Sequence, residues 1–429
     1  MAEIEEDSLE EMTDAESYSA DEVEDLFESK QNNCWKSSPE LHGASSSKLE
    51  PDDDSTSVRK SPYKVLACSS MGGSSKFPKH IKLKIDMNIE DVVKENVLPF
   101  LPAKSLYRYK TVSRAWNQWI SSPFLELKQT NQFKDISGLF SQFPGENPSF
   151  ISFNQDAYGI PVPSLNFLPE SVNIRTTCNG LVCCQARSEE GAYFICNPVT
   201  GHWTKLPSPN LYHGPEPAIV LAFDAYALNF ASNYELVCAV LDLTDHSIVQ
   251  FEIYSSRTNS WRVADAVCCE EGWLNLSAGC YMKGVVYWET SRGGILAFDL
   301  KHEEYGILSL PPSKGPNGAL VEINGELSYI LPKKQDNFWE IYVYGNMNMS
   351  LKGTISLDPE IVGETYGVCQ ALTCINSDLL IILLGTKVIT YRVRTRKLEC
   401  FYDMRINGVS KYLPYVNSLI PVARPRPEI

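Results

Sequence analysis

Two different spacings of apolar residues divide the chain. Between Met87 and Leu127, apolar residues recur every three or four positions, which is the spacing of one helical face. From about residue 130 this spacing gives way to short apolar runs that alternate with turn residues, which is typical of β-strands. The pattern predicts a small helical module followed by a larger β-domain.

The helical segment predicts two short helices. Asn88 is a candidate N-cap, and the acidic residues after it fill the first turn, where the helix dipole favours negative charge. Pro99 has no amide hydrogen, so we expect the first helix to end at about Leu98. We expect Ser105 to cap a second helix that continues to Ile120, and the Ser-Ser-Pro sequence that follows to end it.

These helices carry more large apolar side chains than two short helices can bury between them. Each such side chain is worth about 1.5–3 kcal/mol when it is fully buried. The surplus must therefore pack either against the β-domain of the same chain or against a partner protein. Periodicity alone leaves both alternatives open.

The residues Leu101–Phe124, LPAKSLYRYKTVSRAWNQWISSPF, resemble the second half of an F-box, the motif that binds the Skp-type adaptor of cullin ubiquitin ligases. The first half departs from the family, because Ile89 and Glu90 stand where F-boxes open with Leu-Pro. Cations in the second half suit an acidic adaptor, although a solvated helix face explains them equally well. The resemblance implies an adaptor-binding set of Ile89, Val93, Val97, Leu98, Leu101, Pro102, Leu106, Tyr109, Val112, Trp116 and Ile120.

The β-domain repeats one unit of a turn followed by an apolar strand. The repeats are anchored at Asn179, Asn233, Lys283, Asn324 and Asn376, spaced by 54, 50, 41 and 52 residues. A strand–turn–strand unit follows each anchor. Small sheets stacked around an axis bury both of their faces, so the repeat predicts a mainly β fold with a six-bladed β-propeller. A two-sheet sandwich is the alternative, but it does not produce near-equal periods.

We expect the sixth blade to close with FISFN, near residue 150, and YLPYVNSLIPV, near the end of the chain. The repeats TTCNGLVCC and YFICNPVTGHWTKLP are similar to the plant F-box-associated domain, which is related to kelch repeats. This resemblance covers about 165–420. The expected domains are a disordered acidic and Ser-rich arm (1–79), the F-box module (80–128), a connector with the first propeller strands (129–164) and the F-box-associated propeller (165–429).

Charge and composition add an appended arm but no further domain. The net charge is −15, and residues 1–30 hold thirteen acids against one base, which gives −12. Such an arm cannot bury enough apolar surface to offset the cost of ordering it. We expect no secretory signal and no transmembrane helix. The thirteen cysteines lack metal-binding spacing, so we expect reduced thiols, no metal, and a protein of the nucleus or cytoplasm.

Catalytic motifs are not evident, so we expect neither catalysis nor a cofactor. Asp224, Asp299 and Glu340 are the carboxylates that a propeller enzyme would need near its axis, but acids at strand ends usually accept hydrogen bonds from turn amides. No basic stripe indicates nucleic-acid binding. The two resemblances imply instead a substrate-recognition subunit of an SCF-type ubiquitin ligase, which binds the Skp-type adaptor and through it a cullin.

The alternative is a propeller scaffold or regulator that acts without ubiquitin transfer. The sequence does not identify the target protein or its binding residues. The Pro-rich loops Pro207–Pro217 and Pro311–Gly318 are candidates for contact with the target.

Overall fold

The structure is a computed structural model that describes residues 88–422 with gaps at 134–135, 189–190, 226–228, 243, 246, 270–278, 291–292, 311–317, 336–337, 358–368, 376–377, 386 and 404–410. The expected N-terminal arm, residues 1–79, lies outside the described residues. So do the first residues of the expected helical module, 80–87.

The described helices lie mainly before the first strand. They are α2 (Ile89–Asn96), the 3-10 helix η1 (Leu98–Phe100), α3 (Ala103–Tyr109), α4 (Arg114–Ile120), α5 (Pro123–Gln132) and, after the second strand, α6 (Gln155–Tyr158). Asn88 caps α2 as predicted, because its Oδ1 accepts the amide hydrogen of Glu90 at 3.3 Å. The first helix ends before Pro99, which lies inside η1. Both predictions are confirmed.

The second predicted helix is wrong in its extent, because the structure divides it into α3 and α4. α3 begins two residues before the expected Ser105 cap. Two β-branched residues, Thr111 and Val112, lie in the break, where they disfavour continuation of the helix. Ser113 then caps α4, since its Oγ accepts the amide hydrogen of Trp116 at 3.2 Å.

Helix α5 was not predicted. The Ser-Ser-Pro sequence ends α4, but it also begins a new helix. Ser122 is the N-cap, with its Oγ accepting the amide hydrogen of Leu125 at 3.3 Å, and Pro123 occupies the first turn, where its missing amide hydrogen is not needed. Helix α5 therefore forms a third side of the module: η1 and α4 pack against it, and Lys128 of α5 donates to the Glu95 carbonyl of α2 at 2.9 Å.

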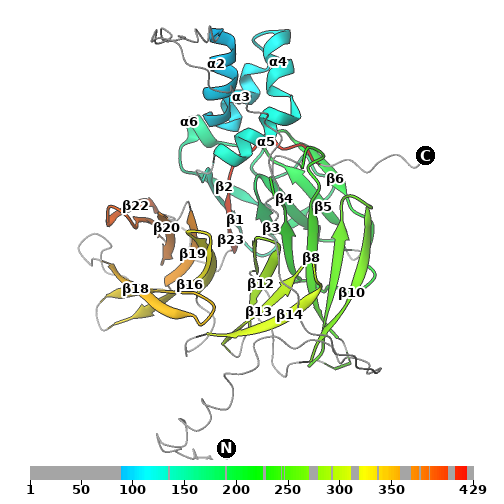
Figure 1. The fold of residues 1–429 in the computed structure, drawn as a ribbon, viewed down its shortest axis with the longest axis vertical. Coiled ribbons are helices and arrows are strands. Elements are labelled where there is room, and N and C mark those ends of the chain that lie inside the picture. The colour runs from blue at the N-terminus through cyan, green and yellow to red at the C-terminus, as the bar shows by residue number, and fades with distance from the viewer. Residues whose placement is uncertain are drawn as a thin grey trace, which may run out of the picture.

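The β-domain consists of six antiparallel sheets, which confirms the mainly β, six-bladed propeller (Figure 1). One sheet has three strands, with β1 (Gly138–Gln142) between β2 (Ser149–Ser152) and β23 (Lys411–Tyr415). The other five each have four consecutive strands: β3–β6 (Val172–Cys178, Leu181–Ala186, Tyr193–Asn197, His202–Lys205), β7–β10 (Ala218–Ala222, Glu235–Leu241, Val249–Ser255, Ser260–Cys268), β11–β14 (Gly279–Met282, Val285–Glu289, Gly294–Asp299, Glu304–Ser309), β15–β18 (Ala319–Ile323, Glu326–Lys334, Trp339–Gly345, Ser350–Leu357) and β19–β22 (Cys369–Ile375, Leu379–Leu384, Lys387–Arg392, Lys397–Asp403).

The sheets close into a ring through the two ends of the β-domain. The first strand of each four-stranded blade lies next to the first strand of the following blade, and β23 lies between β19 and β3. β23 is therefore the innermost strand of the blade that β1 and β2 complete. The predicted closure by residues near 150 and near the C-terminus is confirmed, and β1 is the strand of this blade that the sequence pattern missed.

Tight turns join the first and second strands of several blades. Asn179 and Gly180 have φ angles of 46° and 90°, and Asn324 and Gly325 have φ angles of 54° and 77°. Two consecutive residues with positive φ form the turn that suits the twist of a β-hairpin, and Asn-Gly is the pair that adopts it at least cost. The anchors at Asn179, Lys283 and Asn324 are thus the inner hairpins of three blades, and the anchor at Asn376 lies outside the described residues.

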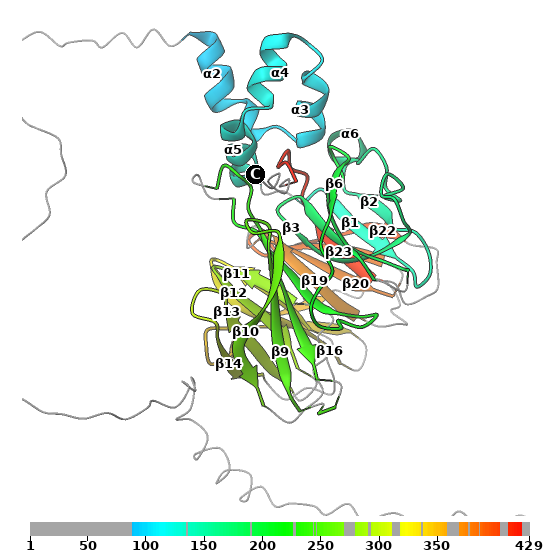
Figure 2. The same cartoon turned by 90° about the vertical axis from the view of Figure 1, so that its right-hand side faces the viewer.

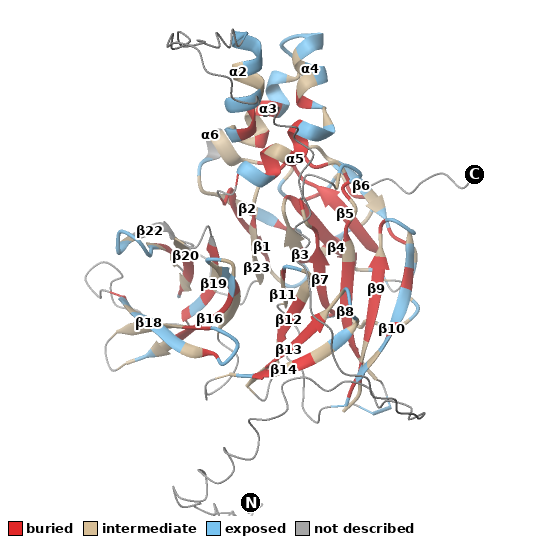
Figure 3. Ribbon diagram, viewed as in Figure 1, coloured by how far each residue is buried: buried red, intermediate tan, exposed pale blue. Residues whose placement is uncertain are grey.

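The core lies between neighbouring blades. Leu181, Cys183 and Ile195 from the β3–β6 blade share one buried cluster with Ile219 and Leu221 from the β7–β10 blade. The inner and middle strands β4, β5 and β7 are buried along their whole length, whereas the outer strand β10 is partly exposed, as Figure 3 shows. The apolar runs that recur along the sequence are therefore the strands whose side chains pack one blade against the next.

The propeller has two faces that differ in position relative to the helical module. The end of β23 lies beside the β3–β4 turn, where the Tyr415 hydroxyl donates to the Gly180 carbonyl at 3.1 Å. β1 also begins there, so we call this the helix-side face (Figure 2). At the other end of the same strands, the Gln142 amide donates to the Val172 carbonyl at 2.8 Å. This end, where β3 and β23 begin and β4 ends, is the far face.

Candidate functional site

The structure divides the eleven predicted adaptor-binding residues by exposure. Four are exposed: Ile89, Val97, Tyr109 and Val112. Four are half-buried: Val93, Leu101, Pro102 and Trp116. Three are buried: Leu98, Leu106 and Ile120.

The burial of Leu98, Leu106 and Ile120 corrects the expectation that the whole set faces a partner. Each is at most 1% exposed, and all three belong to one cluster that includes Leu125 of α5 and Phe140 of β1. The missing piece in the sequence argument was α5, which covers the side of α2 and η1 that two helices alone would leave open. These three leucine and isoleucine side chains hold the module together and join it to the propeller.

A substantial set of apolar side chains still points away from the chain's own core. Val112 is 62% exposed and Ile89 is 77% exposed. We call the exposed large apolar residues of the module the outward apolar set: Ile89, Val97, Phe100, Tyr107, Tyr109, Val112 and Phe124. Scattered exposed apolar residues are normal, but this number within one small module is typical of a protein-binding surface.

Aromatic rings fix the relative position of the module's short helices. The rings of Tyr109 and Trp116 meet edge to face at 5.8 Å, and Trp116 lies 6.0 Å from Trp119. The ammonium group of Lys94, on α2, lies 3.9 Å from the centre of the Trp119 ring. These contacts fix α2, α3 and α4 relative to one another, and with them the positions of their outward side chains.

The cations of the module are not all free surface charges. Arg108 and Arg114 are exposed, as a partner-facing charge must be. Lys110 differs, because burial lowers its pKa although the nearby Glu126 acts in the opposite direction. Burial raises the pKa of Glu126 to about 7, partly offset by the Lys110 charge. The two charges therefore influence each other between the end of α3 and the start of α5.

The propeller axis holds a cavity of about 250 Å³ with a mixed polar and apolar lining from all six inner strands. Its described lining contains one carboxylate, Glu289, which accepts a hydrogen bond from the Tyr329 hydroxyl at 2.6 Å. The three expected carboxylates lie elsewhere. Asp224 bonds the Tyr281 hydroxyl, Asp299 accepts two amides of its own turn, and Glu340 bonds Tyr342.

No group of His, Cys, Asp and Glu side chains suited to a metal ion comes together in the part of the chain that the structure describes. None of the helices in that part has the length and apolar character needed to cross a membrane. Among the described cysteines, all of which are free thiols, Cys269 is exposed.

The loop Pro207–Pro217, a predicted target contact, lies on the far face between the β3–β6 and β7–β10 blades. Tyr212 and Glu216 in this loop are exposed, so the expected accessibility is confirmed. Contact with a target stays a prediction. Residues 311–317 of the other predicted loop lie outside the described residues.

Residues 151–354 match the family described as the F-box associated beta propeller domain. This part of the propeller is similar to F-box-associated domains. The match begins in β2 and ends in β18, and the structure continues the fold on both sides of it with β1 and with β19–β23.

Curated relatives are similar to a larger share of the chain than this match covers. F-box protein At5g49610 of Arabidopsis thaliana is 27% identical over 339 residues, which cover 73% of this chain and 91% of the relative. F-box protein At5g07610 of the same plant is 27% identical over 62% of this chain and 66% of its own length. F-box protein At5g03970 is 23% identical over 73% and 82%. The similarity to plant F-box proteins with a C-terminal F-box-associated domain is thus confirmed.

Proposed function

We propose that this chain is a substrate-recognition subunit of an SCF-type ubiquitin ligase. In this proposal the outward apolar set of the helical module binds a Skp-type adaptor, which in turn binds a cullin, while the F-box-associated propeller holds a target protein. The chain makes and breaks no bonds itself. It raises the effective concentration of target lysines near the ubiquitin-loaded enzyme. The proposal assigns the protein to the nucleus or cytoplasm.

The observation that carries this proposal is the exposure of Val112 and its neighbours on a module that stands beside an F-box-associated propeller. Covering a few such side chains supplies the desolvated centre that protein interfaces need. Exposed Arg108 and Arg114 on the same module suit an acidic partner surface and would speed its association.

A second function has a specific observation in its favour. Because Leu98, Leu106 and Ile120 are buried within the chain, fewer side chains remain for an adaptor than the sequence implied. Adaptor binding weakened in this way would leave a propeller scaffold or regulator that acts without ubiquitin transfer.

Affinity capture of the tagged full chain from plant cells, with the proteasome and cullin neddylation blocked, separates the two functions. The variant Val112→Asp places a charge in the outward apolar set without touching the core. Leu351→Asp is the matched control, because Leu351, on β18 of the propeller, is 53% exposed, close to the exposure of Val112. We expect the wild type and Leu351→Asp to capture adaptor and cullin and Val112→Asp to lose both. A folded wild type that captures neither supports the scaffold.

A further inference from the structure

The far face of the propeller carries a polar cavity of about 380 Å³ beside the loop Pro207–Pro217. Its described lining includes Arg175, Arg187 and His213 but no carboxylate. Glu189 and Glu190, at the neighbouring β4–β5 corner, lie outside the described residues. The cavity is at the opposite end of the blades from the helix-side face, so a target bound there would not compete with an adaptor for space.

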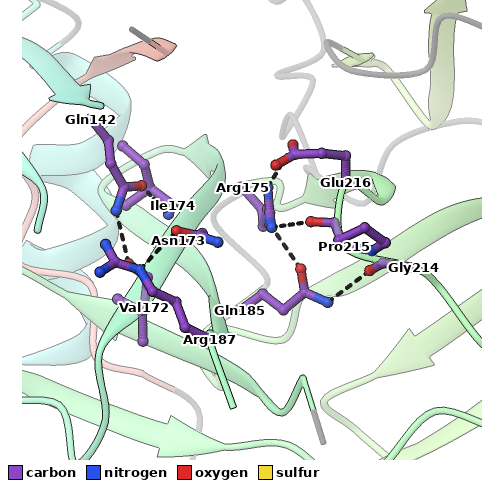
Figure 4. Close-up of polar contacts among 10 residues, drawn as sticks. All are labelled: Gln142, Val172, Asn173, Ile174, Arg175, Gln185, Arg187, Gly214, Pro215 and Glu216. Atoms are coloured by element: carbon purple, nitrogen blue, oxygen red, sulfur yellow. Dashed lines mark hydrogen bonds and ion pairs between the residues drawn. The ribbon is translucent and has the colours of Figure 1, made fainter. Parts of the chain in front are cut away.

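Arg175 is the central group of this cavity (Figure 4). It is 5% exposed, and the residue lines both this cavity and the cavity at the propeller axis. Its Nε donates to Gln185 Oε1 at 2.9 Å, and its Nη2 donates to the Pro215 carbonyl. One side-chain contact and one backbone contact thus fix the guanidinium in place.

A carboxylate already occupies the remaining side of Arg175. The Glu216 carboxylate lies 2.7 Å from Arg175 Nη1, although the Glu216 side chain is 71% exposed. A mostly exposed carboxylate therefore forms the ion pair with a buried guanidinium. Lys411 is a second cation close enough to Arg175 to be affected by its charge. Burial, and after it the Arg175 charge, lowers the pKa of Lys411 to about 8.

The loop that carries Glu216 is held by other contacts than this ion pair. Glu252, fully buried in the next blade, accepts hydrogen bonds from the amides of Asn210 and Leu211 at 2.7 and 3.1 Å and lies 2.8 Å from His213 Nε2. The Gln185 amide donates to the Gly214 carbonyl at 3.1 Å. The Glu216 side chain can leave Arg175 while the frame of the loop stays in place.

We propose that this cavity is a docking site for an acidic side chain of the target protein, whose carboxylate replaces that of Glu216 on Arg175. The proposal rests on the proposed function and deepens it by naming the chemistry of the recognised segment. Because Nε and Nη2 are held by Gln185 and Pro215, Arg175 offers an incoming carboxylate the charge-assisted hydrogen bond from Nη1 that Glu216 now accepts, in a fixed direction. Glu216 acts as an internal competitor that keeps the buried cation paired until a target arrives.

The test is fluorescence anisotropy of the purified full chain with labelled nonapeptide pools. The pools have random flanks and a fixed central glutamate, glutamine or phosphoserine. Tighter binding of the glutamate pool than of the glutamine pool is expected. Glu216→Gln should tighten glutamate-pool binding by about two- to fivefold, the factor expected on removing one exposed ion pair. Glu304→Gln, which removes an exposed acid from another blade, is the matched control and should change nothing.

Arg175→Lys keeps a cation but loses the planar fork, so it should abolish the preference for glutamate. If that variant does not fold, as shown by its thermal unfolding curve, the response to Glu216→Gln decides alone. Equal binding of the glutamate and glutamine pools, preference for phosphoserine, or no response to Glu216→Gln would overturn the proposal. Val112→Asp should leave peptide binding intact, so failure of adaptor binding and failure of this site are distinguishable.

Discussion

At the scale of single residues, Glu126 shows how an undetected helix changes local chemistry. Its position in the sequence suggests an ordinary surface acid. The structure instead buries it at the start of α5 and raises its pKa to about 7, with Lys110 as a partial counter-charge. A carboxyl with a raised pKa stabilises the fold while it is protonated, and this contribution is lost as the pH rises from about 4.5 through 7.

We therefore expect Glu126→Gln to become more stable than the wild type as the pH rises. The difference should be small at pH 4.5 and should reach at most about 3 kcal/mol at pH 8. Thermal unfolding of the full chain at several pH values measures it. The control is Glu95→Gln, which removes a mostly exposed acid paired with Lys128 on the same module. A pH-independent difference would contradict this account of Glu126.

Substitutions of Leu106 and Val112 test which apolar residues of the helical module are buried in the core and which face outward. Leu106 is fully buried, so Leu106→Ala should cost about 2–5 kcal/mol of unfolding free energy. Val112→Ala should change stability by less than about 0.5 kcal/mol, because its side chain is largely exposed. Chemical denaturation of both variants gives the comparison, and similar losses in the two would show that the assigned exposures are wrong.

At the scale of elements, the sequence predicted those whose signals are local. Asn88 at the start of α2, Pro99 at its end and the Asn-Gly hairpin turns each combine one residue type with one backbone requirement. The break before Ser113 and the start of α5 were missed because Ser and Pro serve both to end and to begin helices, and only the surrounding contacts decide which. The burial of Leu98, Leu106 and Ile120 follows from that omission.

The far-face loop depends on an anchor that no sequence pattern indicates. Burial raises the pKa of Glu252, but hydrogen bonds from His213 and from backbone amides of the loop outweigh this effect, and the net pKa lies below the usual value. The carboxylate therefore stabilises the loop above the usual glutamate pKa, and the effect is lost as the pH falls through its lowered pKa.

Glu252→Gln should loosen the loop, because the neutral amide accepts fewer and weaker hydrogen bonds than a carboxylate. We expect faster hydrogen exchange in peptides covering 206–217, by about tenfold or more, since charged hydrogen bonds are worth about 1.5–3 kcal/mol. Peptides covering β12 serve as the internal reference and should not change. Unchanged protection of the loop would exclude Glu252 as its anchor.

At the scale of the whole molecule, five repeats at near-equal spacing were enough to predict the propeller, and the closing blade was assigned from two distant segments. Its middle strand, β1, escaped because it lies alone between the helical module and β2, without a repeat to mark it. The sequence pattern also did not predict the proposed acid-binding site at Arg175, because no repeat marks its residues. Arg175, Gln185 and Glu216 come together only when three segments fold.

Ring closure makes a prediction about truncation. β23 pairs with β1 along its whole length, from Lys411 with Gln142 to Tyr415 with Gly138. A chain that ends at residue 410 leaves the inner edge of that blade open and exposes the cores on both sides. We expect it to aggregate or to unfold well below the wild-type temperature, whereas a chain that ends at residue 422 behaves normally. Thermal scanning with size-exclusion chromatography checks both, and equal stability would contradict the closure.

The most direct measurement is the affinity of the purified chain for a purified Skp-type adaptor, by isothermal titration calorimetry. The account predicts that the wild type and Leu351→Asp bind equally and that Val112→Asp binds at least about tenfold more weakly, because it buries an unpaired charge in the interface. A folded wild type that does not bind the adaptor, or a Val112→Asp variant that binds as tightly as the wild type, would contradict the assignment of the outward apolar set as the adaptor-binding surface.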